Sequence, residues 1–524
     1  MKRVLLYNFS GELDDVSHLF PNERLARLAG ILRGEGVDVS ILDRANFKDL
    51  IAFGPAFMEA LGNLGFDESS PEIRDAAQRE AQGLASGGYD TVFAYLWHGS
   101  GFKFTVEVLH CLRRILPDVA IYGIGQKVDW FTHHILDLTG NCLNGLVRGL
   151  GYDTVRHLAA GGAPGTAPDL MLRGCPPPAE TTHSVIDVDD YPPPCYAPDV
   201  YQDIDAKIPI FPISLSNEAC PNRCVYCVRP ENYGRSLRRR DPATVLAEME
   251  MLHRDFGVTH FRVQDSTPPR GALTALATAL QESPLRGIVR MAAFARVDVH
   301  RDEDFRLLRD AGFIAMFFGI ESLDPETLVH LQKGITVEAV TDTLHRAHEA
   351  GIFTVGSFIF PLPGATAGSM KRTLDRLAGS RQDLDALLLL PAGIYPPTPW
   401  GRAPEQYGIR LDPDYIRKSI VYPIKYLIPL RQWKPLPFSY DLMGKPASEV
   451  SFSDIVDAQE AFSDVARNQL KIPAVPDHYV LLASLAGHPP ADFARLAVGC
   501  ISRRDYAGLR DLCRPDCAKE PPTC

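Results

Sequence analysis

Short apolar runs alternate with amphipathic stretches over residues 1–160. Within 22–36, the apolar residues Leu25, Leu28, Ala29 and Leu32 recur at three- and four-residue spacing. This spacing is typical of a helix with one buried face. The runs expected to form strands are 3–9, 38–43, 90–96, 119–125 and 145–149. Such alternation predicts a doubly wound α/β domain, in which helices cover both faces of a parallel sheet.

The same alternation returns over residues 210–400. Asp241 followed by Pro242 is typical of a helix start, with the aspartate as N-cap and the proline in the first turn. The runs expected to form strands are 210–216, 260–265, 289–294, 315–321, 353–360 and 384–392. Six such strand–helix units in a row predict a partial (β/α)6 barrel.

The remaining segments lack this rhythm. Residues 161–209 are rich in proline and glycine, and we expect an ordered linker because proline stiffens the chain. Residues 401–524 carry helical patterns at 412–430 and 453–470. They predict a mainly helical C-terminal domain that shapes a substrate pocket.

Composition narrows the possible functions. The chain has 524 residues, of which 45% are hydrophobic and 23% charged, as in ordinary globular proteins. A net charge of −11 argues against a general nucleic-acid binder. No apolar run approaches the ~20 residues that span a bilayer. The opening MKRVLLYNF lacks the longer apolar core of a signal peptide, so we expect a cytoplasmic protein without a membrane segment.

The cysteines carry the clearest chemical signal. Cys220, Cys224 and Cys227 form the pattern C-x3-C-x2-C, which lets one loop bind three corners of a [4Fe-4S] cube and leaves one iron open. A zinc site or three plain thiols is the alternative, but no second CxxC or histidine pair follows at the usual distance. Three further cysteines near the end of the chain offer a second metal site, with Cys500 nearby: Cys513, Cys517 and Cys524.

The cysteine motif resembles that of the radical SAM superfamily, which places an aromatic residue, here Tyr226, before the third cysteine. The resemblance implies that the open iron binds S-adenosylmethionine (SAM) and that reduction yields a 5′-deoxyadenosyl radical. The segments VQDSTPP, FARVD, FFGIES and FIFPLPGAT also resemble the family, although Pro361 stands where glycine is usual. The SAM-binding residues implied are Tyr226, Asp265, Arg296, Glu321 and Ser322. For Asp265 and Arg296, an ion pair or surface charge remains the alternative.

Residues 1–160 resemble the cobalamin-binding, Rossmann-like domain that precedes the barrel in one class of this superfamily. Glycines at the expected strand ends let the backbone approach a large ring. The cobalamin-binding residues implied are His98, Gly99, Ser100, Gly101, Gly123, Gly125, Gly149 and Gly151. The Asp-x-His-x-x-Gly segment of related domains is absent, so His18 is not expected to bind cobalt. A scaffold that has lost cobalamin is the alternative, and His98 has a structural alternative.

The resemblance implies a radical SAM enzyme that uses cobalamin to methylate a carbon of a small molecule, peptide or natural product. A cobalamin-dependent cyclase or rearrangement enzyme is an alternative, as is a non-catalytic cobalamin or redox sensor. A methylthiotransferase would need three strand-end cysteines in its N-terminal domain to bind a second cluster. Cys111 lies within an expected helix instead, which disfavours this function. The basic run RSLRRR (235–240) is either a solvated helix start or a docking patch for a flavodoxin or ferredoxin.

Overall fold

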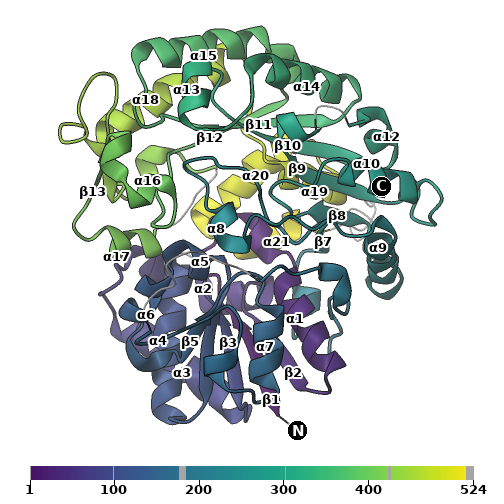
Figure 1. Ribbon diagram of the computed structural model, residues 1–524, viewed down its shortest axis with the longest axis vertical. Helices are drawn as coiled ribbons and strands as arrows, with labels where there is room; N and C mark the ends of the chain where they lie inside the picture. The colour runs from purple at the N-terminus through teal and green to yellow at the C-terminus, as the bar shows by residue number, and fades with distance from the viewer. Residues whose placement is uncertain (1, 98, 176–183, 301–302, 423–426, 515–524) are drawn as a thin grey trace, which may run out of the picture. The chain divides into compact units, whose positions relative to one another are not determined.

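The computed structural model describes residues 2–97, 99–175, 184–300, 303–422 and 427–514 (Figure 1). The chain forms two compact units. The first comprises Met1–Ile208, Glu231–Ser236 and Pro413–Ile424. The second comprises Pro209–Pro230, Leu237–Asp412 and Lys425–Cys524.

The first unit contains a six-stranded sheet with the order β2-β1-β3-β4-β5-β6. Its strands are β1 (Arg3–Asn8), β2 (Asp38–Asp43), β3 (Thr91–Tyr95), β4 (Ala120–Ile124), β5 (Gly145–Val147) and β6 (Leu170–Leu172). Neighbouring strands are parallel except β6, which runs antiparallel to β5. The five strands expected from the apolar runs are all present. The edge strand β6 was not expected, because a three-residue strand within a proline-rich segment gives no periodic signal.

Helices lie on both sides of this sheet. Helix α1 (Glu23–Gly34) packs against α7 (Tyr152–Ala159), and α4 (Gly99–Ile115) packs against α2 (Phe47–Asn63) and α3 (Pro71–Ser86). Figure 1 shows α1 beside α7 and α3 beside α4. The prediction of a doubly wound sheet is therefore confirmed.

The second unit contains a six-stranded parallel sheet whose order, β12-β11-β10-β9-β8-β7, follows the sequence. The strands are β7 (Ile210–Ile213), β8 (His260–Val263), β9 (Arg290–Ala295), β10 (Phe313–Glu321), β11 (Phe353–Ile359) and β12 (Ala386–Leu390). The helices between them include α9 (Pro242–Phe256), α10 (Ala272–Leu280), α12 (Phe305–Asp310), α14 (Val337–Glu349) and α15 (Ala367–Gly379). Asp241 caps α9 by accepting a hydrogen bond from the Ala243 N–H at 3.0 Å, as expected. The sheet and its helices match the expected partial barrel.

Helices from the end of the chain complete the second unit. Helix α19 (Asp477–Ala486) packs against β8 to β11, and Asp477 accepts two hydrogen bonds from Arg262 at 3.0 and 3.1 Å. Burial alone would raise the pKa of Asp477, but Arg262 and His478 hold that pKa at about 2. The C-terminal segment therefore contributes directly to the packing of the barrel sheet.

The expected C-terminal helices need one correction. Residues 412–430 were expected to form one helix, but α17 covers only Tyr415–Ile420. Prolines at 413, 423 and 429 disfavour a continuous helix. The second pattern is confirmed as α18 (Phe452–Asp464), which continues into a five-residue π-helical turn. The domain boundaries drawn at 160, 209 and 400 remain a prediction.

Among the described helices, none has the length and apolar character needed to cross a membrane. Of the three terminal cysteines, Cys513 is buried, as is Cys500. Cys517 and Cys524 lie outside the described residues.

Candidate functional site: a three-cysteine cavity in the barrel

A cavity of about 180 Å³ lies within the second unit, and the three motif cysteines line it. Its wall also contains residues in or just after β8, β9, β10 and β11, together with Lys333, which follows α13 (Pro325–His330). The strand residues are Ser266, Thr267, Phe294, Ala295, Arg296, Phe317, Gly319, Glu321 and Ser357. Of the five residues expected to bind SAM, Tyr226, Arg296 and Glu321 line this cavity, whereas Asp265 and Ser322 do not.

The cysteine loop, which carries Cys220, Cys224 and Cys227, follows β7, and backbone hydrogen bonds fix its position. The Asn217 N–H donates to the Arg238 carbonyl oxygen at 3.1 Å, and the Arg240 N–H donates to the Leu215 carbonyl oxygen at 2.9 Å. Further along, the Val225 N–H donates to the Leu331 carbonyl oxygen at 3.1 Å. These bonds hold the loop while its three sulfur atoms face the cavity.

Each of the three sulfur atoms accepts a hydrogen bond from nitrogen. Asn222 Nδ2 donates to Cys220 Sγ at 3.4 Å, the Arg229 N–H donates to Cys227 Sγ at 3.5 Å, and Arg296 Nη1 donates to Cys224 Sγ at 3.5 Å. Burial raises the pKa of Cys227 to about 11. Hydrogen bonds to sulfur stabilise thiolates and tune the potential of iron–sulfur clusters. Three converging thiols with such donors fit an iron–sulfur cluster.

Asp265 binds the segment that joins β7 to the cysteine loop. Its carboxylate accepts hydrogen bonds from the Leu215 N–H at 2.7 Å and from the Ser216 hydroxyl. Asp265 is fully buried, and this burial raises its pKa to about 6. Because both oxygens are engaged beside β7, the side chain positions the cysteine loop. The neighbouring Ser266 lines the cavity, and its buried hydroxyl has no hydrogen-bond partner among the described residues.

Glu321 lies in a compact polar triangle at the end of β10. Its Oε1 accepts hydrogen bonds from Lys333 Nζ at 2.7 Å and from the Tyr226 hydroxyl at 3.1 Å. Lys333 Nζ also donates to the Tyr226 oxygen at 3.0 Å. Burial, followed by the charge of Glu321, raises the pKa of Tyr226 well above its usual range. The triangle links the cysteine loop to the end of β10.

The backbone at Glu321 is unusual. The pairing of β10 with β11 shifts register between Gly319 and Glu321, and Glu321 has a φ of 69°. A non-glycine residue in this left-handed region costs of order 1 kcal/mol or more and persists where surrounding structure enforces it. The shift turns the carboxylate into the cavity wall.

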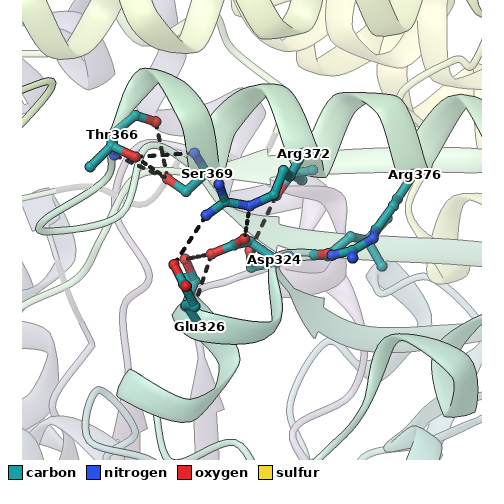
Figure 2. Close-up of polar contacts among 10 residues, drawn as sticks. Asp324, Glu326, Thr366, Ser369, Arg372 and Arg376 are labelled. Atoms are coloured by element: carbon teal, nitrogen blue, oxygen red, sulfur yellow. Dashed lines mark hydrogen bonds and ion pairs between the residues drawn. The ribbon is translucent and has the colours of Figure 1, made fainter.

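The segment after Glu321 is clamped by helix α15, as Figure 2 shows. Arg372 Nε donates to Asp324 at 2.6 Å and its Nη2 donates to Glu326 at 3.2 Å, while Arg376 Nη1 donates to the Leu323 carbonyl oxygen at 2.6 Å. Ser322 belongs to this clamp, because its hydroxyl lies 3.3 Å from Thr373 Oγ1 and accepts from the Asp324 N–H. Ser322 therefore fixes the loop that carries Glu321.

Arg296 connects three parts of the wall. Besides the bond to Cys224, its Nη2 donates to the Lys333 carbonyl oxygen, and its Nε lies 2.7 Å from Asp298 Oδ1. The ion pair that the sequence left as the alternative role of Arg296 is thus present, and contact of Arg296 with SAM stays a prediction. The sequence did not identify Lys333, Phe294 or Phe317. Lys333 lies 12 residues after Glu321, and no local sequence pattern reveals that its side chain lines the cavity.

In the first unit, the expected cobalamin-binding positions lie at or near the carboxyl ends of the strands. His98 lies outside the described residues. The Ser100 hydroxyl accepts a hydrogen bond from the Glu12 N–H at 2.8 Å. A Cβ atom at Gly101 would lie 2.5 Å from the Ser10 carbonyl oxygen, and one at Gly123 would lie 2.7 Å from leucine side chains. Packing against the backbone therefore already requires glycine at 101, whereas at 123 only leucine side chains would have to move.

The other expected glycines occupy turns. Gly99, Gly125, Gly149 and Gly151 have φ values of 62°, 107°, 59° and 67°. These conformations favour glycine whatever lies beside them. Whether the same positions contact cobalamin stays a prediction.

The comparisons with known proteins agree with this arrangement. Residues 215–377 match the model of the Radical SAM superfamily. An uncharacterised methyltransferase of Pyrococcus horikoshii is 26% identical over 188 residues, which cover 36% of this chain and 40% of that protein. An anaerobic magnesium-protoporphyrin IX monomethyl ester cyclase of Cereibacter sphaeroides is 29% identical over 168 residues, 31% of this chain and 27% of that protein. The chain thus spans less than half the length of these curated relatives.

The fold similarity extends over the whole chain. The radical SAM methyltransferase TsrM from Kitasatospora setae, solved with cobalamin and a [4Fe-4S] cluster, matches with a TM-score of 0.66 at 19% identity. The match covers 98% of this chain and 99% of that one. TsrM solved with tryptophan and a SAM analogue matches with a TM-score of 0.60 at 20% identity, over 78% of this chain and 76% of that one.

The matched domain and the shared fold together indicate the class of protein. The chain contains a radical SAM domain, which confirms the resemblance drawn from the cysteine motif. It also shares the whole-chain fold of a radical SAM methyltransferase solved with cobalamin.

Proposed function

We propose that this chain is a cobalamin-dependent radical SAM methyltransferase acting on a carbon of a small-molecule or natural-product substrate. The observation that carries the proposal is the convergence of three thiols with Tyr226 and Glu321 on one cavity, within a radical SAM domain. Active-site groups of barrel enzymes collect at the carboxyl ends of strands, as these do.

The residues that line the cavity have different proposed roles, which follow from their chemistry. Cys220, Cys224 and Cys227 hold the cluster, which supplies the electron for SAM cleavage. Glu321 would accept hydrogen bonds from the hydroxyl groups of SAM, and Arg296 would face the carboxylate of SAM. The apolar rings of Phe294 and Phe317, whose centroids lie 5.0 Å apart in the cavity wall, would exclude water from the site.

Cobalamin supplies methyl-carrier chemistry, and the protein binds and orients it. The strand-end residues of the first unit, His98 to Gly101 with Gly123, Gly125, Gly149 and Gly151, are our proposed contacts. Two buried side chains of this unit support a polar ligand. Arg24 and Asn232 keep side-chain N–H groups without acceptors among the described residues. Cobalamin carries peripheral amides and a phosphodiester, which would satisfy such groups.

A cobalamin-dependent cyclase is the second candidate, favoured by the similarity to a magnesium-protoporphyrin ester cyclase. Methyl transfer distinguishes the two functions. A methyltransferase releases one S-adenosylhomocysteine for every methyl group delivered, whereas a cyclase without methyl transfer releases none.

An acidic electron donor of the flavodoxin or ferredoxin type is the proposed partner. Arg238 and Arg239 are exposed beside the base of the cysteine loop, where Ser216 pairs with Arg239. Arg240 does not belong to this surface, because it is buried and bonds to Glu248 at 2.7 and 3.1 Å. A reducing cytoplasm suits the protein, because the cluster thiols must stay unpaired to bind iron.

The direct test supplies SAM with a trideuterated methyl group to the anaerobically reconstituted protein, with cobalamin, a reductant and a panel of aromatic amino acids that includes tryptophan. We expect a product heavier by the labelled methyl group, together with S-adenosylhomocysteine. Formation of 5′-deoxyadenosine without any S-adenosylhomocysteine would favour the cyclase instead. Absence of both products, in protein that holds cluster and cobalamin, would contradict either enzyme.

A further inference from the structure

Arg24, on helix α1, is a buried cation with unused donors. The residue is 7% exposed, and its Nη2 donates to the Gly149 carbonyl oxygen and, at 3.5 Å, to that of Leu150. Its Nε and Nη1 have no acceptor among the described residues. Burying guanidinium N–H groups without acceptors is unfavourable, because the lost hydration is not replaced. The local structure is therefore suited to a ligand that brings an acceptor.

The turn beside Arg24 has the geometry of an anion site. Gly149 and Gly151 have positive φ values of 59° and 67°, and the chain passes from β5 through this Gly-x-Gly turn into α7. Gly151 is the N-cap of α7, and no side chain caps the helix. The first N–H groups of a helix lack intrahelical acceptors and attract phosphate.

The charges around the turn are mixed, and Asp169 is a second carboxylate close enough to act on Asp129. Arg148 is buried, and its Nε lies 3.9 Å from Asp129 Oδ1. Asp129 accepts the Gly149 N–H at 3.1 and 3.3 Å. Burial raises the pKa of Asp129 to about 7, against the opposing effect of Arg24 and Arg148. Two guanidinium groups thus face one carboxylate that is only partly ionised at neutral pH.

We propose that Arg24 and the β5–α7 turn form a phosphate site that holds the nucleotide-loop phosphodiester of cobalamin. The inference rests on the proposed function. It specifies that the end of β5 recognises the phosphodiester of cobalamin. The unused Nε–H and Nη1–H groups of Arg24 can each donate to a phosphate oxygen, and the charge of the guanidinium strengthens such bonds. Corrin amides are weaker acceptors for the same groups.

Cobinamide provides the test, because it keeps the corrin ring and its amides but lacks the phosphodiester and base. The dissociation constants of cobalamin and cobinamide are measured by absorbance on the purified full chain. The chains compared are the wild type, Arg24→Met, Arg24→Lys and, as a matched control on the same helix, Arg33→Met. Arg33 is exposed, with half of its side-chain surface in contact with solvent.

We expect the wild type and Arg33→Met to bind cobalamin at least tenfold more tightly than cobinamide, because charge-assisted hydrogen bonds contribute about 1.5–3 kcal/mol. Arg24→Met should lose most of this preference while its cobinamide affinity stays unchanged. Arg24→Lys should retain part of the preference, since it keeps the charge but not the planar set of donors. Inorganic phosphate should compete with cobalamin in the wild type and much less in Arg24→Met.

Several outcomes would overturn the inference. Equal affinity of the wild type for both corrinoids would remove the phosphate site while leaving the proposed function intact. A loss of both affinities to the same extent in Arg24→Met would make Arg24 a structural residue. If the folded wild type bound neither corrinoid, the proposed function would fail together with the inference. Should Arg24→Met not fold, the wild-type comparison and Arg24→Lys decide the question alone.

Discussion

At the scale of single residues, the sequence identified the chemistry of the cavity better than its geometry. The four residues of the cysteine motif, including Tyr226, all line the cavity, because a short motif fixes which loop carries them. Asp265 was expected at the cofactor, yet both its oxygens bind the base of the cysteine loop. Sequence alone does not reveal toward which side a strand-end carboxylate turns, since a single residue shift reverses its direction.

Glu321 illustrates the same limit. A carboxylate at this strand end can serve as an ion-pair partner or as a cofactor contact, and the structure contains the ion pair with Lys333 within the cavity wall. The two roles are compatible, because a carboxylate has several acceptor sites and Lys333 uses one oxygen.

Glu321→Gln tests the cofactor role at this scale. We expect SAM affinity to fall by about one to two powers of ten, because charged acceptors contribute about 1.5–3 kcal/mol. Iron content should stay unchanged. Measured by equilibrium binding, the loss should persist in the double variant with Lys333→Met, in which no buried ammonium is left unpaired. If the double variant regained SAM affinity along with stability, Glu321 would act only through Lys333.

At the scale of elements, strands and long helices were predictable because each carries its own hydrophobic period. The apolar runs located the strands to within a few residues, and Asp241 marked the start of α9. The three-residue strand β6 is too short to show a hydrophobic period. In residues 412–430, prolines interrupt the helical period. The clamp of α15 on the segment after Glu321 was also beyond prediction, since it joins residues distant in sequence.

The β5–α7 turn predicts a pH dependence. The pKa of Asp129 is raised to about 7, chiefly by burial, with Arg24 and Arg148 lowering it and Asp169 raising it. A bound phosphate would disfavour the ionised carboxylate, so binding should take up a proton near this pH. The preference for cobalamin over cobinamide should therefore weaken as pH rises from about 6 to 8.

Asp129→Asn provides the control for this titration. It keeps an oxygen acceptor for the Gly149 N–H but carries no titrating charge. We expect its preference for cobalamin to vary much less over the same range. A wild-type preference that increased with pH would contradict the assigned sign.

At the scale of the whole molecule, the sequence predicted two α/β sheets. It did not predict that two later segments of the chain belong to the first unit. Glu231–Ser236, directly after the cysteine loop, and Pro413–Ile424 belong to the first unit. Such excursions carry no compositional signal, because the segments are short and their partners lie elsewhere in the sequence. The match to TsrM over nearly the full length supports the architecture as a whole.

The exposed arginines near the cysteine loop predict a salt-dependent electron transfer. Changing Arg238 and Arg239 to Glu should slow cluster reduction by an acidic flavodoxin severalfold at low salt, because like charges oppose docking. Reduction by dithionite should not change. Arg254→Glu, an exposed change on α9, is the control. If flavodoxin reduced the double variant as fast as the wild type at every ionic strength, this surface would not be the docking site.

The central claim is that three cysteines of one loop hold a [4Fe-4S] cluster that binds SAM. Electron paramagnetic resonance of the anaerobically reconstituted, reduced protein, recorded with and without SAM, tests it most directly. We predict a [4Fe-4S]⁺ signal that shifts when SAM is added and is lost when Cys220, Cys224 and Cys227 are together replaced by Ala, because these thiolates are the protein's ligands to the cluster. A cluster signal that survived the triple replacement, or one in the wild type that SAM left unchanged, would contradict the account.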